Sequence, residues 1–166
     1  MARNQYGEPR ENDKTGILFV CHGNICRSPM AEFVMRDLTM KSGRANEFRI
    51  ASAATTDDEI GNPVHPGTKR VLAAHDIACV GKTARRVKRE EYKNWDLFVV
   101  MDDENVRDLM RAFRNDPEHK VHKLMEYVEG GDLTTARDVA DPWFTGDFEV
   151  TWNDVLAGCQ GILAAM

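Results

Sequence analysis

The sequence predicts an α/β domain built on a parallel β-sheet flanked by helices, and three observations lead to this prediction. The chain has 166 residues, which is the length of one domain. From Thr15 onward, short apolar runs alternate with amphipathic stretches, as strands alternate with helices in this class. No repeat or low-complexity linker marks a second domain. We therefore expect one domain over residues 15–166, preceded by a flexible polar tail over residues 1–14.

The first predicted strand, residues 17–21, is continuously apolar and rich in β-branched and aromatic residues. This composition is typical of a strand that is buried on both faces of a parallel sheet. A helix is predicted after a tight loop, because Ser28 and Pro29 suit its N-cap and its first position. Apolar residues then recur at helical spacing as far as Leu38.

The later elements are predicted from the same two patterns. Apolar runs predict three more strands, at residues 48–53, 97–101 and 121–125. Helical spacing predicts three more helices, around residues 71–72, over residues 106–113 and over residues 148–163. The first of these helices is expected to open after Asn62 and Pro63. The chain should therefore contain four strands and these four helices, with about five helices expected in all.

The chain is acidic, with 27 Asp and Glu residues against 22 Lys and Arg residues, which gives a formal charge of −5 at pH 7. It is not expected to bind nucleic acid or a membrane, since that affinity rests on clustered basic side chains. Its longest apolar runs are far shorter than the roughly 18 residues of a spanning helix. No leader segment is recognisable and the four cysteines form no disulfide framework, so we expect a cytoplasmic location.

The most informative segment is Cys-His-Gly-Asn-Ile-Cys-Arg-Ser at residues 21–28, between the first strand and its helix. Ligands of open α/β sheets bind at the carboxyl ends of strands, where a helix N-terminus offers free N–H groups. If the loop amides converge, they form a nest for a phosphate, and Arg27 can hold two of its oxygens. The predicted phosphate-binding residues are His22, Gly23, Asn24, Ile25, Cys26, Arg27 and Ser28.

Cys21 is the predicted nucleophile of this segment. The field that favours a phosphate in the nest also favours the thiolate form of a cysteine beneath it. Arg27 and the loop amides would then stabilise a phosphoryl group as it moves from the substrate oxygen to sulfur. The alternative for Cys21 is an inert residue packed in the strand.

Asp141 is the predicted proton donor for the leaving oxygen, and Pro142 stiffens the backbone beside it. An ordinary Asp is almost fully ionised at pH 7, so neighbouring negative charge must favour its protonated form, which predicts an acidic pH optimum. Trp143 and Phe144 follow directly. Their rings could wall a slot deep enough for phosphotyrosine and too deep for the shorter phosphoserine.

The segment from Val20 to Pro29 resembles the signature of the low molecular weight protein tyrosine phosphatases. The run from Asp141 to Phe144 resembles their acid loop, and further similarity lies at residues 52–55, 59–63 and 101–105. The resemblance spans roughly residues 15–163. It implies a four-stranded parallel sheet with helices on both faces, of the Rossmann or flavodoxin-like type.

For the chemistry, the resemblance implies a cysteinyl-phosphate intermediate on Cys21, with no metal and no other cofactor. Asp141 would return as a base for hydrolysis, and Ser28 would assist the departing thiolate. Asn24 would be held in a strained conformation by hydrogen bonds from Ser28 and Ser52. The expected substrates are phosphotyrosine-containing proteins, with inorganic phosphate as product, and the enzyme is expected to be a monomer or a weak dimer.

Some positions depart from the pattern or stay open. Asp58 stands where many members place an aromatic residue against the substrate ring, and residues 80–83 lack a histidine that often supports the loop. Cys26 either pairs reversibly with Cys21 or merely packs. Asp102 either caps the next helix or orients groups near Arg27. The basic run over residues 82–89 is expected to be a solvated face, and the side chain of His22 is expected to point into solvent.

Two rival functions are compatible with a phosphate-binding loop of this kind. A thiol-coupled arsenate reductase of the same fold would need two further cysteines close together, whereas Cys79 and Cys159 are far apart in the sequence. A non-catalytic phosphate-binding module would keep the nest without turnover. The presence of both Cys21 and Asp141 favours an enzyme. Ile25 is typical of tyrosine-directed members, whereas arginine-phosphate phosphatases of this fold typically carry Thr there.

Overall fold

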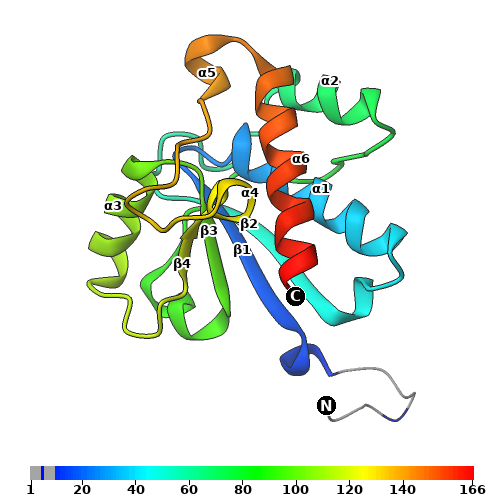
Figure 1. Cartoon of the computed structure of the whole chain (residues 1–166). Coiled ribbons are helices and arrows are strands. Elements are labelled where there is room, and N and C mark those ends of the chain that lie inside the picture. The colour runs from blue at the N-terminus through cyan, green and yellow to red at the C-terminus, as the bar shows by residue number, and fades with distance from the viewer. Residues whose placement is uncertain (1–4, 6–9) are drawn as a thin grey trace.

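The computed structural model describes residue 5 and residues 10–166, and Figure 1 shows the course of the chain. Most of the flexible tail predicted for residues 1–14 therefore lies outside the described residues. Within them, Glu11–Asp13 forms the short 3-10 helix η1 just before the first strand. No helix of the described part of the chain is long and apolar enough to cross a membrane.

The centre of the fold is a sheet of four parallel strands: β1 (Thr15–Cys21), β2 (Phe48–Ala54), β3 (Leu97–Val100) and β4 (Val121–Lys123). Their order in space is β2-β1-β3-β4. β1 is therefore a central strand, which explains its continuous apolar sequence. The predicted four-stranded parallel sheet is confirmed.

The helices follow the strands along the chain. The α-helices are α1 (Arg27–Lys41), α2 (Pro66–Ala74), α3 (Asp103–Phe113), α4 (Glu126–Glu129), α5 (Pro142–Thr145) and α6 (Phe148–Ala165). Two further 3-10 helices are η2 (Ala45–Glu47) and η3 (Arg89–Asn94). α4 and α5 have four residues each, and the sequence pattern did not predict either of them.

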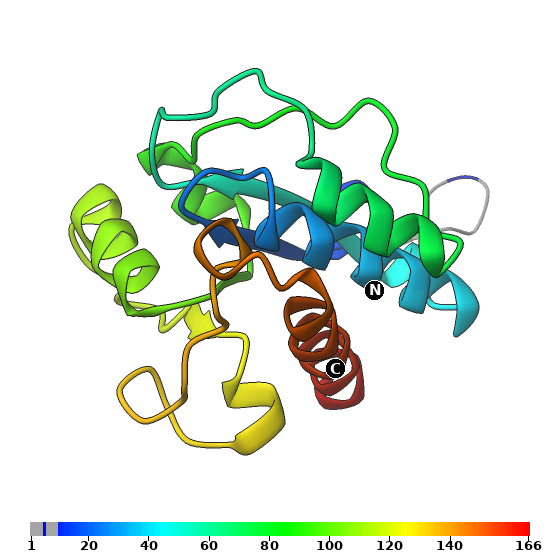
Figure 2. The ribbon, with the colours of Figure 1, turned by 90° about the horizontal axis from the view of Figure 1, so that it is seen from above.

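Alternate residues of β1 pack on opposite faces of the sheet. Ile17 and Phe19 join a cluster with residues of α1 and α6, whereas Leu18 and Val20 join a cluster with residues of α3. Figure 2 shows α1 and α6 on one side of the sheet and α3 on the other. Helices therefore cover both faces, as predicted. Full burial of each such side chain contributes roughly 1.5–3 kcal/mol to folding.

Several predicted boundaries differ from the structure. α1 begins at Arg27 with Cys26 as its N-cap, so Ser28 and Pro29, predicted as the N-cap and first position, lie inside its first turn. The helix expected to open after Asn62 and Pro63 begins at Pro66, because His65 is its N-cap and accepts a hydrogen bond from the N–H of Gly67. Pro63 instead forms an isolated β-bridge with Thr83. The last strand ends at Lys123, since the chain turns into α4 directly after residues 124 and 125.

Candidate active site

The loop over residues 22–26 connects β1 to α1 at the carboxyl end of the sheet. Asn24 shapes it. Its φ of 59° lies in the left-handed region, where Asn is tolerated better than most residues. The expectation that Ser28 and Ser52 donate to Asn24 is wrong in direction, because the Asn24 Nδ2 group donates to their hydroxyl oxygens at 2.8 and 2.9 Å. Asn24 Oδ1 accepts from the N–H of Arg85 at 3.2 Å.

The backbone amides of the loop are free to bind an anion. In the described part of the chain, no protein atom accepts a hydrogen bond from the N–H groups of residues 22–28. Unpaired N–H groups at the start of a 15-residue helix attract negative charge. This is the local condition for binding a phosphate in a protein whose net charge is negative.

Cys21 ends β1 beneath this loop and is 3% exposed. Its sulfur lies 3.0 Å from the Ser28 hydroxyl oxygen, a contact that stabilises a thiolate when the hydroxyl donates. The second cysteine of the site, Cys26, lies within the loop. Burial, together with the charges of Cys21 and Asp141, raises the pKa of Cys26 to about 12, so Cys26 remains a neutral thiol. Both cysteines are free in this structure.

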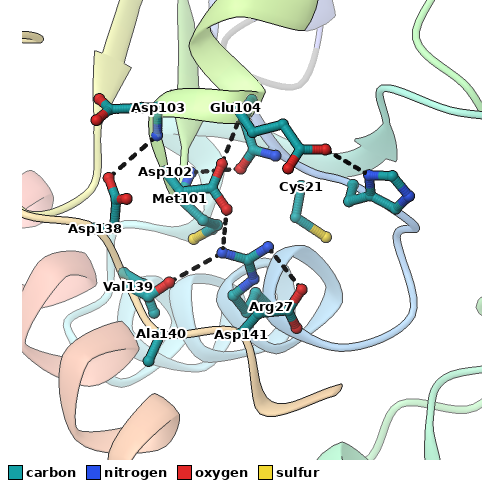
Figure 3. Close-up of polar contacts among 12 residues, drawn as sticks. Cys21, Arg27, Met101, Asp102, Asp103, Glu104, Asp138, Val139, Ala140 and Asp141 are labelled. Carbon is teal, nitrogen blue, oxygen red and sulfur yellow. Dashed lines mark hydrogen bonds and ion pairs between the residues drawn. The ribbon is translucent and has the colours of Figure 1, made fainter. Parts of the chain in front are cut away.

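Arg27 connects Cys21 to the acidic residues of the site. It is 2% exposed. Its Nη1 donates to Asp102 Oδ2 at 2.7 Å and to the carbonyl of Val139 at 3.0 Å, and its Nη2 donates to Asp141 Oδ2 at 3.2 Å. Burial opposes its charge, but the negative charges of Cys21, Asp102 and Asp141 prevail and raise the pKa of Arg27. Figure 3 shows Cys21, Arg27 and Asp141 facing the same space.

Asp102 performs both of the roles that the sequence left open. One carboxylate oxygen accepts from the N–H of Asn105 at 2.8 Å and caps α3, while the other accepts from Arg27. A single carboxylate thus fixes the guanidinium relative to the start of α3. The ordering of Arg27 depends on a helix that lies far away in the sequence.

A pocket of about 470 Å³ opens above these groups. It is lined by most of the predicted site residues, namely Cys21, His22, Gly23, Ile25, Cys26, Arg27, Asp58, Asp141, Trp143 and Phe144. Asn24 and Ser28 do not line it; they are 1% and 0% exposed and support the loop from behind. Trp143 and Phe144 are 57% and 83% exposed, which places them at the rim. One-turn helix α5 carries both aromatic residues, and Asp141 caps it by accepting from the N–H of Trp143.

The side chain of His22 does not simply point into solvent, and this differs from the prediction made from the sequence. Its Nε2 lies 2.7 Å from Asp58 Oδ2 and its Nδ1 lies 3.2 Å from Glu104 Oε1. Two carboxylates can accept from one imidazole only when both ring nitrogens carry protons. Partial burial opposes that charge, but the hydrogen bonds to Asp58 and Glu104 prevail and raise the pKa of His22. Asp58 therefore lines the pocket as the partner of His22.

A buried ion pair supports the loop from below, and sequence reasoning missed it. The Ser52 hydroxyl, which accepts from Asn24, donates to Glu32 Oε1 at 2.6 Å, and Lys82 Nζ lies 3.3 Å from the same oxygen. Lys82 also donates to the carbonyl of Ser52 at 2.9 Å, so its expected place on a solvated face is wrong. Glu32 lies four residues after Ser28 on the buried side of α1, and that spacing was a usable signal.

Comparison with known proteins gives one consistent family. The profile of the low molecular weight phosphotyrosine protein phosphatases matches residues 16–166. The low molecular weight protein-tyrosine-phosphatase YfkJ of Bacillus subtilis is 41% identical over 152 residues, covering 90% of this chain and 94% of that protein. The low molecular weight phosphotyrosine protein phosphatase of Rattus norvegicus is 34% identical over 149 residues, covering 89% of this chain and 92% of that protein.

Comparison with solved structures agrees with this result. The crystal structure of YfkJ from Bacillus subtilis superimposes with a TM-score of 0.87 and covers 94% of this chain and 96% of that one. The similarity therefore includes both the central strand with its loop and the distant segment with the Asp-Pro sequence. The chain belongs to the low molecular weight protein tyrosine phosphatase family of phosphoric monoester hydrolases.

Proposed function

We propose that this protein hydrolyses phosphotyrosine monoesters through a cysteinyl-phosphate intermediate on Cys21. The observation that supports this most is the convergence of a buried cysteine, a ring of unpaired amides and an Arg27–Asp141 pair on one pocket. Each group supplies one requirement of phosphoryl transfer: a nucleophile, anion binding and a proton donor.

In the first step, the Cys21 thiolate attacks phosphorus while the bond from phosphorus to the tyrosine oxygen breaks. Arg27 and the loop amides stabilise the equatorial oxygens, and Asp141 gives its proton to the leaving oxygen. Arg27 donates to the Asp141 carboxylate in the ion pair described above. A bound phosphate ester adds negative charge beside Asp141 and competes for the same guanidinium, so substrate binding favours the protonated acid.

In the second step, water attacks the phosphocysteine and Asp141 accepts its proton. The bond from phosphorus to sulfur breaks, and the Ser28 hydroxyl, 3.0 Å from the sulfur, stabilises the thiolate that leaves. The products are the tyrosine hydroxyl and inorganic phosphate. The loop and the guanidinium therefore bind the same anion in both steps.

The exposed rings of Trp143 and Phe144 favour an aryl phosphate over a short alkyl phosphate, because an aromatic leaving group packs against them. The proposed substrates are phosphotyrosine-containing proteins. We place the enzyme in the cytoplasm as a monomer or weak dimer.

The test is turnover of p-nitrophenyl phosphate, with a chelator present, by the wild type and by Cys21→Ser, Asp141→Ala and Cys79→Ser. Cys21→Ser should lose all turnover yet still bind phosphate, since the amides and Arg27 remain. Asp141→Ala should lose roughly 10²–10⁴-fold, because hydrolysis of the phosphocysteine then lacks its general base. Cys79→Ser is the matched control and should behave as wild type. Near-normal turnover by Cys21→Ser would refute the mechanism.

The same experiment separates the rival functions. A phosphate-binding module would bind phosphate in the wild type without turnover. An arsenate reductase would need thiols to relay oxidation from Cys21. Cys159 is fully buried, and that burial raises the pKa of its thiol, which opposes such a relay.

A further inference from the structure

Lys123 is a buried cation that the proposed mechanism leaves unused. It is the last residue of β4 and is 1% exposed. A buried lysine is costly unless all its charge is compensated. Here the three ammonium donors match three oxygens: the carbonyl of Ala136 at 2.9 Å, Asp138 Oδ1 at 2.8 Å and Asp103 Oδ1 at 2.6 Å.

Two of these oxygens belong to the segment that leads to Asp141. Asp138 is also tied to the start of α3, because its Oδ1 accepts from the N–H of Asp103 at 3.1 Å (Figure 3). The next residue, Val139, donates its N–H to the carbonyl of Met101 at 2.8 Å. Lys123 therefore fixes residues 136–138 against β4 and α3, immediately before the part of the segment that Arg27 contacts.

These contacts bear on the position of Asp141 in the site. Only two hydrogen bonds tie residues 140 and 141 to distant parts of the described chain: Thr151 Oγ1 donates to the carbonyl of Ala140 at 3.4 Å, and Arg27 donates to the Asp141 carboxylate. The other hydrogen bonds of Asp141 are local and come from the N–H groups of residues 143–145. The place of Asp141 over Cys21 thus depends on where residues 136–139 enter the site. Lys123 does not line the pocket, so its effect on the reaction is indirect, through this segment or through the start of α3, which it contacts at Asp103.

We propose that Lys123 is a positioning residue for the general acid, holding the segment 136–138 so that Asp141 reaches the leaving oxygen. The proposal rests on the proposed function, in which Asp141 is that acid. A displaced acid impairs expulsion of poor leaving groups more than expulsion of good ones, because a good leaving group departs with little protonation.

The experiment compares kcat/KM, which reports the first chemical step, for p-nitrophenyl phosphate and for phenyl phosphate, whose leaving group is poorer. Lys123→Met should lower kcat/KM on phenyl phosphate about tenfold more than on p-nitrophenyl phosphate, a part of the full general-acid contribution. Asp138→Ala removes a carboxylate that contacts Lys123, at an exposed position. It should show the same pattern and serves as the test in case Lys123→Met fails to fold. Lys123→Arg should restore most of the loss.

Lys120→Met is the matched control. Lys120 precedes β4 at its other end, is largely buried and donates to the carbonyl of Tyr92 at 2.8 Å, away from the pocket. It should lower stability without changing the ratio between the two substrates. Equal losses on both substrates in Lys123→Met and Asp138→Ala, or no loss, would overturn the proposal. If Asp141→Ala itself shows no leaving-group effect, the proposed acid is wrong and the role of Lys123 falls with it.

Discussion

His22 shows how one residue of the loop acquires a role beyond its backbone amide. Its ring joins Asp58, which follows β2, to Glu104, in the first turn of α3. Many relatives are expected to place an aromatic residue at the position of Asp58. Here the same side of the pocket is formed by an imidazole held between two carboxylates, whose hydrogen bonds favour its charged form. Its hydrogen bonds therefore depend on pH.

The pKa of His22 is raised above its ordinary value of 6.5 in the folded protein. Its stabilising contribution is therefore fully present below pH 6.5 and is lost as the pH rises through the raised pKa. We expect His22→Gln to lower the free energy of unfolding more at acidic pH than at alkaline pH. Urea unfolding of both proteins across this range is the measurement. A difference that is constant with pH would show that His22 is neutral in the folded state.

At the scale of elements, the close packing of α6 on the segment after β4 depends on glycine. A Cβ atom at Gly161 would overlap the carbonyl oxygen of Tyr127, which belongs to the backbone of α4 and cannot rotate away. α6 packs against α1 as well as against α4, so it has little room to move. This contact fixes α6 relative to the segment that begins at Lys123.

Gly161→Ala should therefore destabilise the protein. Alanine gains about 1 kcal/mol over glycine in a helix, whereas overpacking costs typically 1–3 kcal/mol. The overlap involves rigid backbone, so we place the cost at about 3 kcal/mol and the net loss at about 2 kcal/mol. Urea unfolding tests this, with the exposed neighbour Gln160→Ala as a control that should change stability by less than about 0.5 kcal/mol. A stabilised Gly161→Ala protein would contradict the packing described here.

Elements with a strong local signal were predictable from the sequence. The apolar run of β1 and the stripe of α6 each reflect burial that periodicity reports directly. The start of α2 was not predictable from the sequence, because the isolated bridge between Pro63 and Thr83 keeps the chain extended there. That pairing is a tertiary contact, and no local pattern encodes it.

At the scale of the whole molecule, the site is assembled from the carboxyl ends of several strands. Cys21 comes from β1 and Ser52 from β2, and Asp102 is the second residue after β3. Asp141 belongs to the segment that Lys123 of β4 contacts. The positions of Cys21, Arg27 and Asp141 in one pocket were predictable, because motif and spacing specify them. Of the charged residues that orient them, Asp102 was predicted as one of two alternatives, whereas Glu32, Lys82 and Lys123 were not predicted.

The reason is physical. Glu32, Lys82 and Lys123 would ordinarily lie on the surface, and only pairing in the folded protein makes their burial possible. A sequence shows their charge without showing their partners. Lys123 did carry a signal, since it lies in the middle of the predicted strand at residues 121–125.

The central claim is that the phosphoryl group is transferred to the sulfur of Cys21 before it is hydrolysed. Its most direct test is to mix the Asp141→Ala protein, in which hydrolysis of the intermediate is slowed, with p-nitrophenyl phosphate. The reaction is quenched with denaturant during the first turnover, and the peptides are mapped by mass spectrometry. We predict a phosphoryl group on Cys21 and none in a parallel Cys21→Ser sample. Turnover without covalent phosphate, or phosphate on a different residue such as His22 or Ser28, would contradict the account.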